Sequence, residues 1–382
     1  MNTAAGRIEW TRRHMPLLAE MRGRFEKTKP FDGMGMGFRI HLEPKTAVLV
    51  EVLLAGGAHI TAIGNQGTTQ FDTVEFLNDA GANIIERPNE SKVDIAANLD
   101  RIAAMQPQIV LDNGAELIVR CLDNGSPPMG ATEETTSGAF LLREEYPGQV
   151  RFPVIVINDS PLKAIVENKH AVGESTMDEI VRTTNVSLHR KRVVVFGYGW
   201  CGKGIALYGR DRGADITVVE VDPIKALEAA MDGFGTATAQ DAASFGQLFI
   251  TATGRSDVVP YRLMELMQDG AILVNVGHVD TEFDIPALHE HTGRDEIKTS
   301  ITQHVMPSGR TLFVLADGQM VNLAVEGGRG NSIESMDLGF TLQALSLELL
   351  ATDPSSLGPG PQAVPGSINE WIATTMLRIM QG

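Results

Sequence analysis

The stretch Lys191–Asp222 constrains the fold of this 382-residue chain more than any other part. The apolar run Val193–Phe196 is typical of a buried parallel strand, and a helical pattern begins at Ile205. A second apolar run follows at Ile216–Val219. Between the first run and the helix lie three glycines in G-x-G-x-x-G spacing: Gly197, Gly199 and Gly202. This order of strand, glycine turn, helix and strand indicates a dinucleotide-binding unit of the Rossmann type.

Each glycine, and the acid that ends the second strand, has a physical role in such a site. Gly197 allows a tight turn, Gly199 lets the backbone approach a pyrophosphate, and Gly202 lets the helix pack closely on the strand. The helix start offers N–H groups and a positive dipole end to the phosphates. Glu220 can accept hydrogen bonds from the adenosine ribose and would repel a 2′-phosphate, so we predict NAD rather than NADP. The alternative is an ordinary glycine-rich turn.

Length and composition set the outer limits. The length favours two domains, and 43% hydrophobic residues suffice for a sizeable core. A net charge of −16 argues against nucleic acid or an anionic membrane surface as a partner. Two cysteines make no disulfide framework, and no metal site is predicted. The N-terminus lacks the apolar core of a signal peptide and no membrane-length apolar run is present, so we expect a cytoplasmic protein.

Polar residues follow several predicted strands in the first half of the chain. Ile60–Ile63 precedes the polar turn at residues 64–70, and Ile109–Leu111 precedes Asp112, Asn113 and Gly114. Val154–Ile157 precedes a segment with Lys163, Glu167 and Asn168. Open α/β sheets bind ligands at the carboxyl ends of their strands, so this half is also predicted to be doubly wound.

Lys163 and Glu167 have the i,i+4 spacing that places two side chains on one helix face. They form either part of a site or a surface ion pair, and their place after a buried strand favours a site. Gly130–Gly138 is a second candidate segment, because it sets Glu133 and Glu134 beside three hydroxyl residues: Thr135, Thr136 and Ser137.

The second half continues the strand alternation of a cofactor domain. Leu248–Ala252 ends at Thr253, and Ala271–Val276 ends at Gly277 and His278. His278 is either a core histidine or, at the end of a strand beside a nicotinamide, a proton carrier. The remaining expected segments are helices in 1–30, Thr46–Leu54, Phe71–Asp79 and Met336–Leu350, a glycine-rich stretch at Phe31–Ile40, a strand at Leu312–Leu315, a loose connector at Asp353–Gly366 and an amphipathic helix at Ile368–Met380.

With these motifs in order, the chain resembles the S-adenosyl-L-homocysteine hydrolase (adenosylhomocysteinase) family from about His41 to Leu350. The matching stretches are TEETTSG (132–138), INDSPLK (157–163), VVVFGYGWCGKG (193–204), VVEVDPIKALEA (218–229), NVGHVDTEFDI (275–285) and LADGQMVNL (315–323). The resemblance implies two Rossmann-like α/β domains. We expect a substrate domain at 1–172, completed by 331–382, and an inserted NAD-binding domain at 173–330. It also implies a homo-oligomer, either a dimer or a tetramer.

The family's chemistry makes a sugar C–H bond temporarily acidic. Oxidation of the ribose 3′-hydroxyl to a ketone, with tightly bound NAD, lets the carbanion at C4′ delocalise as an enolate. A base then removes the C4′ proton, and the 5′ substituent leaves by β-elimination. Water adds to the resulting enone and the ketone is reduced again.

The resemblance also implies roles for individual residues. Glu134 matches the acid that holds the ribose diol, and Lys163 matches the lysine beside C4′, where an amine can act as base. Glu167 stands where the family has aspartate, and His41 and His278 match the histidines on the 5′ side. The expected cofactor contacts, besides the glycine turn and Glu220, are Thr135, Thr136, Ser137, Asn168, Thr253, Gly277 and Asn322.

Four departures from the family pattern concern the rest of the site. Asn113 replaces an aspartate that works with the histidine at C5′, and an amide cannot exchange that proton. Glu43 stands where a threonine is usual in the adenine pocket, and Lys45 where Glu or Gln is usual. Arg329 replaces a gate histidine. The family's C-terminal tail, ending in Lys and Tyr, has no counterpart here.

These departures favour a specialised relative that acts on another nucleoside. We predict an NAD-dependent nucleoside dehydratase or lyase that expels a 5′ group and leaves a 4′,5′-unsaturated product, as in angustmycin-type chemistry. The first alternative is a true adenosylhomocysteinase with a tolerant pocket. The second is a non-catalytic relative that binds NAD. A 2-hydroxyacid dehydrogenase would share the fold, but its arginine and histidine signature is not evident.

Overall fold

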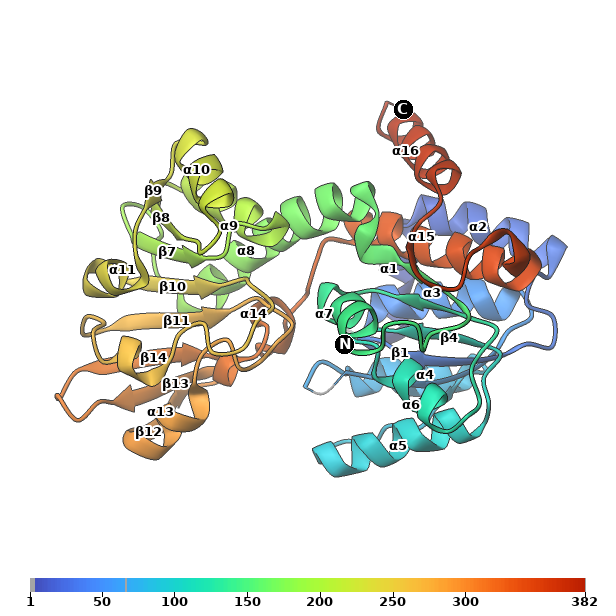
Figure 1. Cartoon of the computed structure of the whole chain (residues 1–382), viewed down its shortest axis with the longest axis horizontal. Helices are drawn as coiled ribbons and strands as arrows, with labels where there is room; N and C mark the ends of the chain where they lie inside the picture. Colours follow the sequence, from blue (N-terminus) through green and yellow to red (C-terminus); the bar gives the residue numbers. More distant parts are fainter. Residues whose placement is uncertain (1–3, 66, 382) are drawn as a thin grey trace. The chain divides into compact units, whose positions relative to one another are not determined.

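The computed structural model describes residues 4–65 and 67–381, which form two compact units (Figure 1). The first unit comprises Met1–Ala164 and Ile333–Gly382, and the second comprises Ile165–Ser332. The sequence placed the corresponding boundaries at 172/173 and 330/331. Three parts of the predicted segments lie outside the described residues: residues 1–3, Gln66 and Gly382. The predicted class, α/β with Rossmann-like parallel sheets, is confirmed in both units.

The first unit is built on a parallel sheet of seven strands in the order β15-β6-β5-β4-β1-β2-β3. Its strands are β1 (Gly35–Arg39), β2 (His59–Ile63), β3 (Asn83–Ile84), β4 (Ile109–Asp112), β5 (Gly130–Glu133), β6 (Pro153–Val156) and β15 (Gly360–Ala363). The central strand β4 is buried along its whole length, as expected for a strand covered on both faces.

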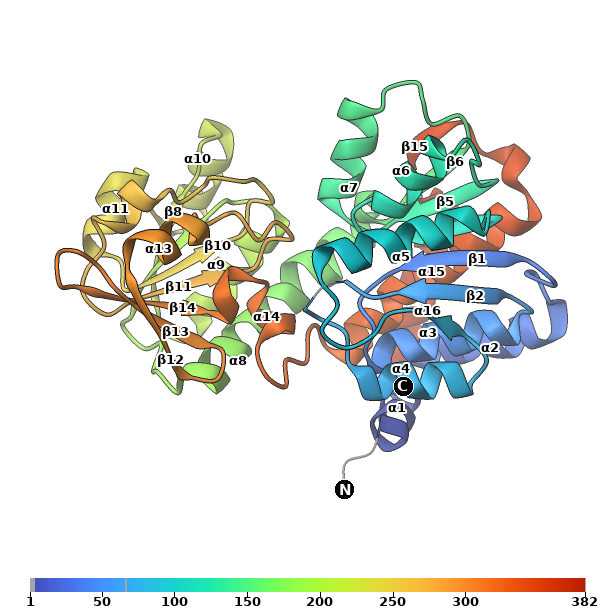
Figure 2. The same ribbon diagram turned by 90° about the horizontal axis from the view of Figure 1, so that it is seen from below.

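Helices cover both faces of this sheet (Figures 1 and 2). Helices α3 and α15 pack on one face, and α5 and α6 pack on the other through an apolar cluster with the strands. The helices are α1 (Ala4–Arg13), α2 (Pro16–Thr28), α3 (Pro44–Ala55), α4 (Phe71–Asp79), α5 (Lys92–Ala104), α6 (Glu116–Asp123), α7 (Thr136–Phe140), α15 (Ile333–Thr352) and α16 (Gly366–Met380). Short π-helical or 3-10 turns occur at Leu141–Glu145, Ile157–Asp159 and Pro354–Ser356.

Four strands of this sheet were not expected from the sequence: β1, β3, β5 and β15. The glycine-rich stretch Phe31–Ile40 contains β1. A Cβ at Gly37 of this strand would lie 2.9 Å from Ile102 of α5. A glycine in this strand therefore allows the helix to approach, although glycine is generally unfavourable in strands. The prediction of a loose connector at Asp353–Gly366 was wrong. This segment contains β15, which pairs with β6 at the edge of the sheet.

The second unit is built on a sheet of eight strands in the order β12-β13-β14-β11-β10-β7-β8-β9. All of the pairs are parallel except those of β13, which runs antiparallel to both of its neighbours. The strands are β7 (Arg192–Phe196), β8 (Asp215–Val219), β9 (Gly235–Thr236), β10 (Leu248–Thr251), β11 (Ala271–Asn275), β12 (Gly293–Lys298), β13 (Ile301–Val305) and β14 (Thr311–Leu315).

The alternation of side chains along β7 divides the core of this unit into two layers. Val193 and Val195 pack with α8, α9 and α14, whereas Val194 and Phe196 pack with α11, α12 and α13. The helices are α8 (Val172–Thr184), α9 (Trp200–Asp211), α10 (Pro223–Met231), α11 (Ala239–Phe245), α12 (Tyr261–Met264), α13 (Ile285–His291) and α14 (Val321–Ala324). A 3-10 turn occurs at Ala316–Gly318. None of the helices in the described residues is both long and apolar enough to span a bilayer.

The start of α2 is capped by a carboxylate from the far end of the sequence. Asp337 of α15 accepts hydrogen bonds from the backbone N–H groups of Leu17 (2.8 Å) and Leu18 (2.9 Å). N–H groups in the first turn of a helix have no partner within the helix, so this carboxylate satisfies two of them. Burial raises the pKa of Asp337 to about 7, against the lowering effect of the two N–H donors.

We predict that Asp337 gives the folding stability a dependence on pH. Because the folded chain retains the Asp337 proton above the ordinary pKa of 3.8, the free energy of unfolding should fall as pH rises from there to about 7. Asp337→Asn should reduce this slope, measured by urea unfolding at several pH values. The exposed Glu75→Gln on α4 serves as control. An unchanged slope in Asp337→Asn would contradict the assignment.

Candidate active site

The carboxyl ends of adjacent strands in the first unit bring several predicted residues to one edge. His41 follows β1, Asn113 follows β4, Glu134 follows β5, and Lys163 follows β6 through a 3-10 turn. Asn65 follows β2 at the same edge, although no sequence motif indicated a specific role for it. The strands β6, β5, β4, β1 and β2 are consecutive in the sheet. The sequence pattern therefore led to the edge at which such sheets bind ligands.

Lys163 and Glu134 form a buried ion pair at this edge. Gln343 of α15, which is fully buried, donates a hydrogen bond from Nε2 to the second oxygen of Glu134. Lys163 is 5% exposed and Glu167 is 3% exposed, so the alternative of a surface ion pair between them is wrong. Both residues lie in the π-helical segment Lys163–Ala171. Gln343 was missed because a glutamine in an apolar helix carries no local motif.

The neutral side chains of Thr68 and Asn65 contact the His41 imidazole. Its Nδ1 lies 2.7 Å from the Thr68 hydroxyl, and its Nε2 lies 3.2 Å from Asn65 Nδ2, which also donates to Asn113 Oδ1 at 2.9 Å. The Thr68 hydroxyl donates its one hydrogen to the carbonyl of Asn65 (2.9 Å). In this pattern it accepts from His41, so we infer the tautomer with the imidazole hydrogen on Nδ1 and the lone pair on Nε2.

Two buried carboxylates hold the loops that carry Asn113 and Glu134. Glu133 accepts hydrogen bonds from the N–H groups of Gly114 (3.0 Å), Ala115 (2.8 Å) and Thr135 (2.7 Å). Asp112, opposite Glu133 in the sheet register, accepts from the N–H of Asn113 at 2.8 Å. Burial, with the charge on Asp112, raises the pKa of Glu133 to about 8. Glu133 is thus the organiser of this edge, a role that its position beside Glu134 did not reveal.

The three predicted hydroxyl residues have different surroundings. Thr135 donates from its hydroxyl to Glu133 (2.6 Å) and accepts from the N–H of Gly138, so it caps α7. Ser137 Oγ lies 3.2 Å from the Thr135 hydroxyl, and Thr136 is exposed. Their contacts with a nicotinamide stay a prediction.

Glu43 and Lys45, predicted to contact the substrate, form a second buried pair. Lys45 Nζ lies 3.2 Å from Glu43 Oε2, and Lys45 and Glu43 are 6% and 7% exposed, respectively. Glu43 also caps α3, because its carboxylate accepts the N–H of Lys45. The pair follows β1 and so starts from the same sheet edge as His41.

The glycine turn of the second unit has the features that a dinucleotide site requires. Gly197 has φ +94°, which favours glycine. A Cβ at Gly202 would lie 2.0 Å from the carbonyl oxygen of Gly197, so only glycine allows α9 to approach the turn. A Cβ at Gly199 would meet no atom within 4 Å, which leaves room above the backbone for a phosphate. The residues present therefore fit NAD.

Glu220 directly follows β8 and lies beside this turn. Its carboxylate accepts hydrogen bonds from the N–H groups of Tyr198 (2.7 Å), Val221 (2.8 Å) and Asp222 (3.0 Å). The acid is half-buried and is oriented by the backbone of both segments that would flank an adenosine ribose. Its position fits the predicted role.

Glu282 organises the neighbouring loops and was not predicted. This fully buried carboxylate accepts from the N–H groups of Thr253 (3.0 Å) and Gly254 (2.8 Å) and from the Thr253 hydroxyl (2.7 Å). A Cβ at Gly277 would lie 1.6 Å from Glu282 Oε1, which explains the glycine at this position. The predicted residues Thr253 and Gly277 thus lie against the same acid.

The remaining predicted residues of the second unit occupy separate positions. Asn322 donates to Ser175 Oγ at 3.2 Å, and its buried Oδ1 has no hydrogen-bond partner among the described residues, as expected of an atom that awaits a ligand. Arg329 donates to the buried Glu179 of α8 at 3.3 Å, and its own side chain is 67% exposed. His278 follows β11 and is half-buried, as is Asn168 in the π-helical segment.

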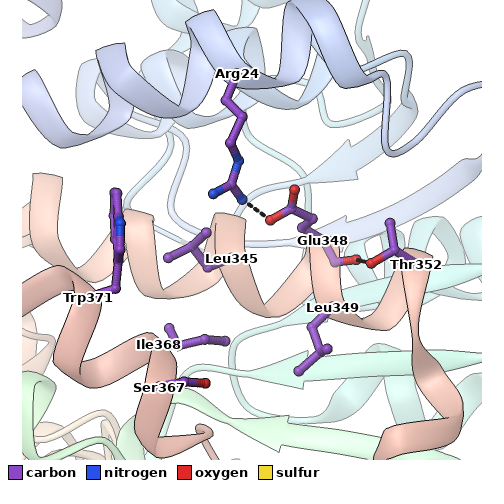
Figure 3. Close-up of a pocket in the computed structure, with 8 residues that line it drawn as sticks. All are labelled: Arg24, Leu345, Glu348, Leu349, Thr352, Ser367, Ile368 and Trp371. Carbon is purple, nitrogen blue, oxygen red and sulfur yellow. Dashed lines mark hydrogen bonds and ion pairs between the residues drawn. The ribbon is translucent and has the colours of Figure 1, made fainter.

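A cavity of about 270 Å³ lies elsewhere in the first unit, between α2, α15 and α16 (Figure 3). The Arg24–Glu348 ion pair borders it, together with apolar side chains that include Leu345, Ile368 and Trp371. None of the predicted site residues lines this cavity. We therefore assign it no part in the chemistry.

The chain is similar in sequence to known proteins along most of its length. A sequence model described as S-adenosyl-L-homocysteine hydrolase matches residues 2–126, and one for the NAD-binding domain of that enzyme matches residues 168–328. S-inosyl-L-homocysteine hydrolase from Methanopyrus kandleri is 42% identical and covers 98% of this chain and 89% of its own length. Adenosylhomocysteinase from Thermococcus kodakarensis is 40% identical, with 98% and 90% covered.

A solved structure supports the fold alone. A dipicolinate synthase from Bacillus halodurans aligns with a TM-score of 0.53 and covers 84% of this chain and 99% of its own. Its sequence identity is 12%, so nothing beyond the fold is inferred from it.

The glycine turn leads to a prediction with a matched pair of variants. Gly199→Ala should lower the NAD content of the purified protein without lowering the thermal stability of the NAD-free protein, because the new methyl group meets no protein atom but enters the space of the pyrophosphate. Gly202→Ala should lower both, because its methyl group collides with Gly197. Gly23→Ala on α2 is the control. NAD content is measured after gel filtration, and full retention in Gly199→Ala would refute the placement.

Proposed function

The chain belongs to the S-adenosyl-L-homocysteine hydrolase family, and we propose that it hydrolyses the 5′-thioether bond between a purine nucleoside and homocysteine. The family, its NAD cofactor and the enzymatic character are shown by the two matching domains and the named relatives. The substrate proposed first is S-adenosyl-L-homocysteine, which with water would give adenosine and homocysteine. When bound, NAD supplies the reversible oxidation of the ribose 3′-hydroxyl.

The buried pair of Lys163 and Glu134 is the observation that carries this proposal. In the proposed reaction, the Glu134 carboxylate accepts hydrogen bonds from the ribose diol, and Gln343 keeps that carboxylate in place. As the substrate diol replaces Lys163 on Glu134, the Lys163 ammonium gives one proton to solvent. The resulting neutral amine removes the C4′ proton and becomes an ammonium again. Burial of both groups keeps water from competing for the proton.

The neutral groups around His41 favour a thioether substrate over a 5′-hydroxyl. A thiolate leaves more readily than hydroxide, since a thiol has a pKa of about 8.5 and the pKa of water is far higher. Hydroxide would need a general acid, whereas the hydrogen-bond pattern gives His41 a lone pair on Nε2 and gives Asn113 an amide. The same Nε2 can accept a proton from the water that adds at C5′.

The Glu43–Lys45 pair supports a purine base as part of the substrate. It presents one hydrogen-bond acceptor group and one donor group, and the six-membered edge of either adenine or hypoxanthine offers the complement. The relatives named for S-inosyl- and S-adenosyl-homocysteine substrates are 42% and 40% identical in sequence to this chain, respectively. Both thioethers therefore belong in the assay.

A nucleoside dehydratase or lyase is the second candidate. Asn113 argues against it at the leaving-group step, because an amide cannot protonate hydroxide, but favours it at the water-addition step. Loss of a carboxylate beside His41 would remove one group able to activate water for addition, so that the reaction could stop at the 4′,5′-unsaturated product. The names of the relatives favour hydrolysis. They also favour catalysis over a non-catalytic NAD-binding role.

A direct assay separates these functions. Release of a free thiol from S-adenosyl- or S-inosyl-homocysteine supports hydrolysis. Loss of the mass of one water molecule from a nucleoside with a 5′-hydroxyl, without thiol release from either thioether, would replace hydrolysis by dehydration. We further propose that the protein acts in the cytoplasm as a homo-oligomer, and sedimentation analysis would test the latter.

Replacing Lys163 should separate oxidation from proton abstraction. Lys163→Gln retains N–H donors for Glu134 but has no basic nitrogen, so exchange of the substrate's C4′ proton with solvent deuterium should fall by at least about 100-fold. Reduction of the bound cofactor by substrate should persist. Mass spectrometry and nicotinamide absorbance measure the two steps. Lys27→Ala, an exposed lysine of α2, is the control. Undiminished exchange would remove Lys163 from the role of base.

A further inference from the structure

Glu86 is a buried carboxylate that none of the predicted roles uses. It lies just after the edge strand β3 and is 8% exposed. Its Oε2 accepts hydrogen bonds from the backbone N–H of Gly64 (2.7 Å) and from the hydroxyl of Thr69 (2.9 Å). One oxygen atom therefore joins two positions five residues apart in the segment after β2.

The segment held by Glu86 carries both residues that orient His41. Asn65 follows Gly64 directly, and its Nδ2 lies 3.2 Å from His41 Nε2. Thr68 precedes Thr69 directly, and its hydroxyl lies 2.7 Å from His41 Nδ1. Both residues that contact the imidazole are therefore direct sequence neighbours of a residue that is hydrogen-bonded to Glu86.

The fit between Glu86 and Gly64 is sterically specific. A Cβ at Gly64 would lie 2.4 Å from Glu86 Oε2 and 1.9 Å from Thr69 Oγ1. Gly64 does not have the positive φ that would require glycine, so the close approach of these two side chains is what excludes a larger residue. Burial raises the pKa of Glu86, while the bonds from Thr69 and Gly64 lower it.

We propose that Glu86 is a positioning residue, whose carboxylate holds Asn65 and Thr68 so that His41 keeps its hydrogen on Nδ1 and its lone pair on Nε2. The inference rests on the proposed function for its kinetic consequence. His41 would act at C5′, whereas Lys163 and Glu134 would act at C3′ and C4′. Loss of Glu86 should therefore slow the steps at C5′ and leave exchange of the C4′ proton largely intact.

The experiment compares Glu86→Ala with the conservative Glu86→Gln, whose carbonyl oxygen can still accept from Gly64 and Thr69. In Glu86→Ala, steady-state thiol release from S-adenosyl-homocysteine should fall about 10- to 100-fold, because each enzyme molecule must complete water addition at C5′ before it can release another thiol. C4′ exchange should change less than about threefold. Glu86→Gln should restore most of the thiol release. Glu75→Gln, an exposed acid on α4, is the control.

The imidazole nitrogen signals of His41, assigned with His41→Asn, give a second readout that needs no turnover. They should show the Nδ1–H form in the parent protein and a mixture of the two neutral forms in Glu86→Ala. Thr69→Val removes one hydrogen-bond donor to Glu86. It should change thiol release and the His41 signals in the same direction as Glu86→Ala, but by a smaller amount. It replaces Glu86→Ala in the test if that variant fails to fold.

The outcomes are decisive in each direction. An equal fall in thiol release and C4′ exchange, or unchanged His41 signals in the variants, would overturn the positioning role. If the parent protein releases no thiol and exchanges no C4′ proton, the proposed function fails, and the His41 signals alone decide the role of Glu86.

Discussion

Buried carboxylates that accept hydrogen bonds from backbone N–H groups hold the loops on which the candidate site is built. Glu133 holds the turn after Asn113, and Glu282 holds the turn at Thr253. A chain that leaves the end of a parallel strand loses its ladder partners, so its N–H groups need other acceptors. A carboxylate provides several acceptor positions from one side chain. One buried acid can therefore satisfy and orient a whole turn, and the side chains that project from the turn inherit this order.

This solution carries an electrostatic cost that shapes the rest of the edge. Burial raises the pKa of both Glu133 and Glu282, because an anion loses its hydration, and the N–H donors oppose the shift. The ion pair between Lys163 and Glu134 solves the same problem with a cation in place of backbone dipoles. Removal of either partner would leave an unpaired buried charge, which is strongly unfavourable. The pair is therefore stable until a substrate offers Glu134 other donors.

Local sequence patterns predicted the parts of the molecule whose physics is local. The glycine turn at Gly197 needs only a positive φ and a close approach, and both are visible as residue type and spacing. The strand β1 was missed because its glycines conceal an apolar pattern. The reason for one of them, Gly37, lies in α5, which is distant in the sequence. Gln343 was missed for the same reason, since its partner Glu134 is 209 residues away. The polar residues at strand ends indicated the edge, but which acid would bind substrate and which would bind backbone depended on neighbouring strands.

The division of charge along this edge follows the demands of the proposed reaction. The ionic pair of Lys163 and Glu134 is placed for C3′ and C4′, where a proton must be removed from carbon and a strong base is needed. His41, Asn65 and Asn113 form a neutral cluster for C5′. At neutral pH a thiolate can leave without being protonated, whereas hydroxide cannot. A neutral cluster at C5′ is therefore sufficient for a thiolate leaving group. A carboxylate beside His41 would favour the imidazolium and remove the lone pair that water addition needs. The asymmetry of charge thus matches a thioether better than an alcohol, with Asn113 as part of that match.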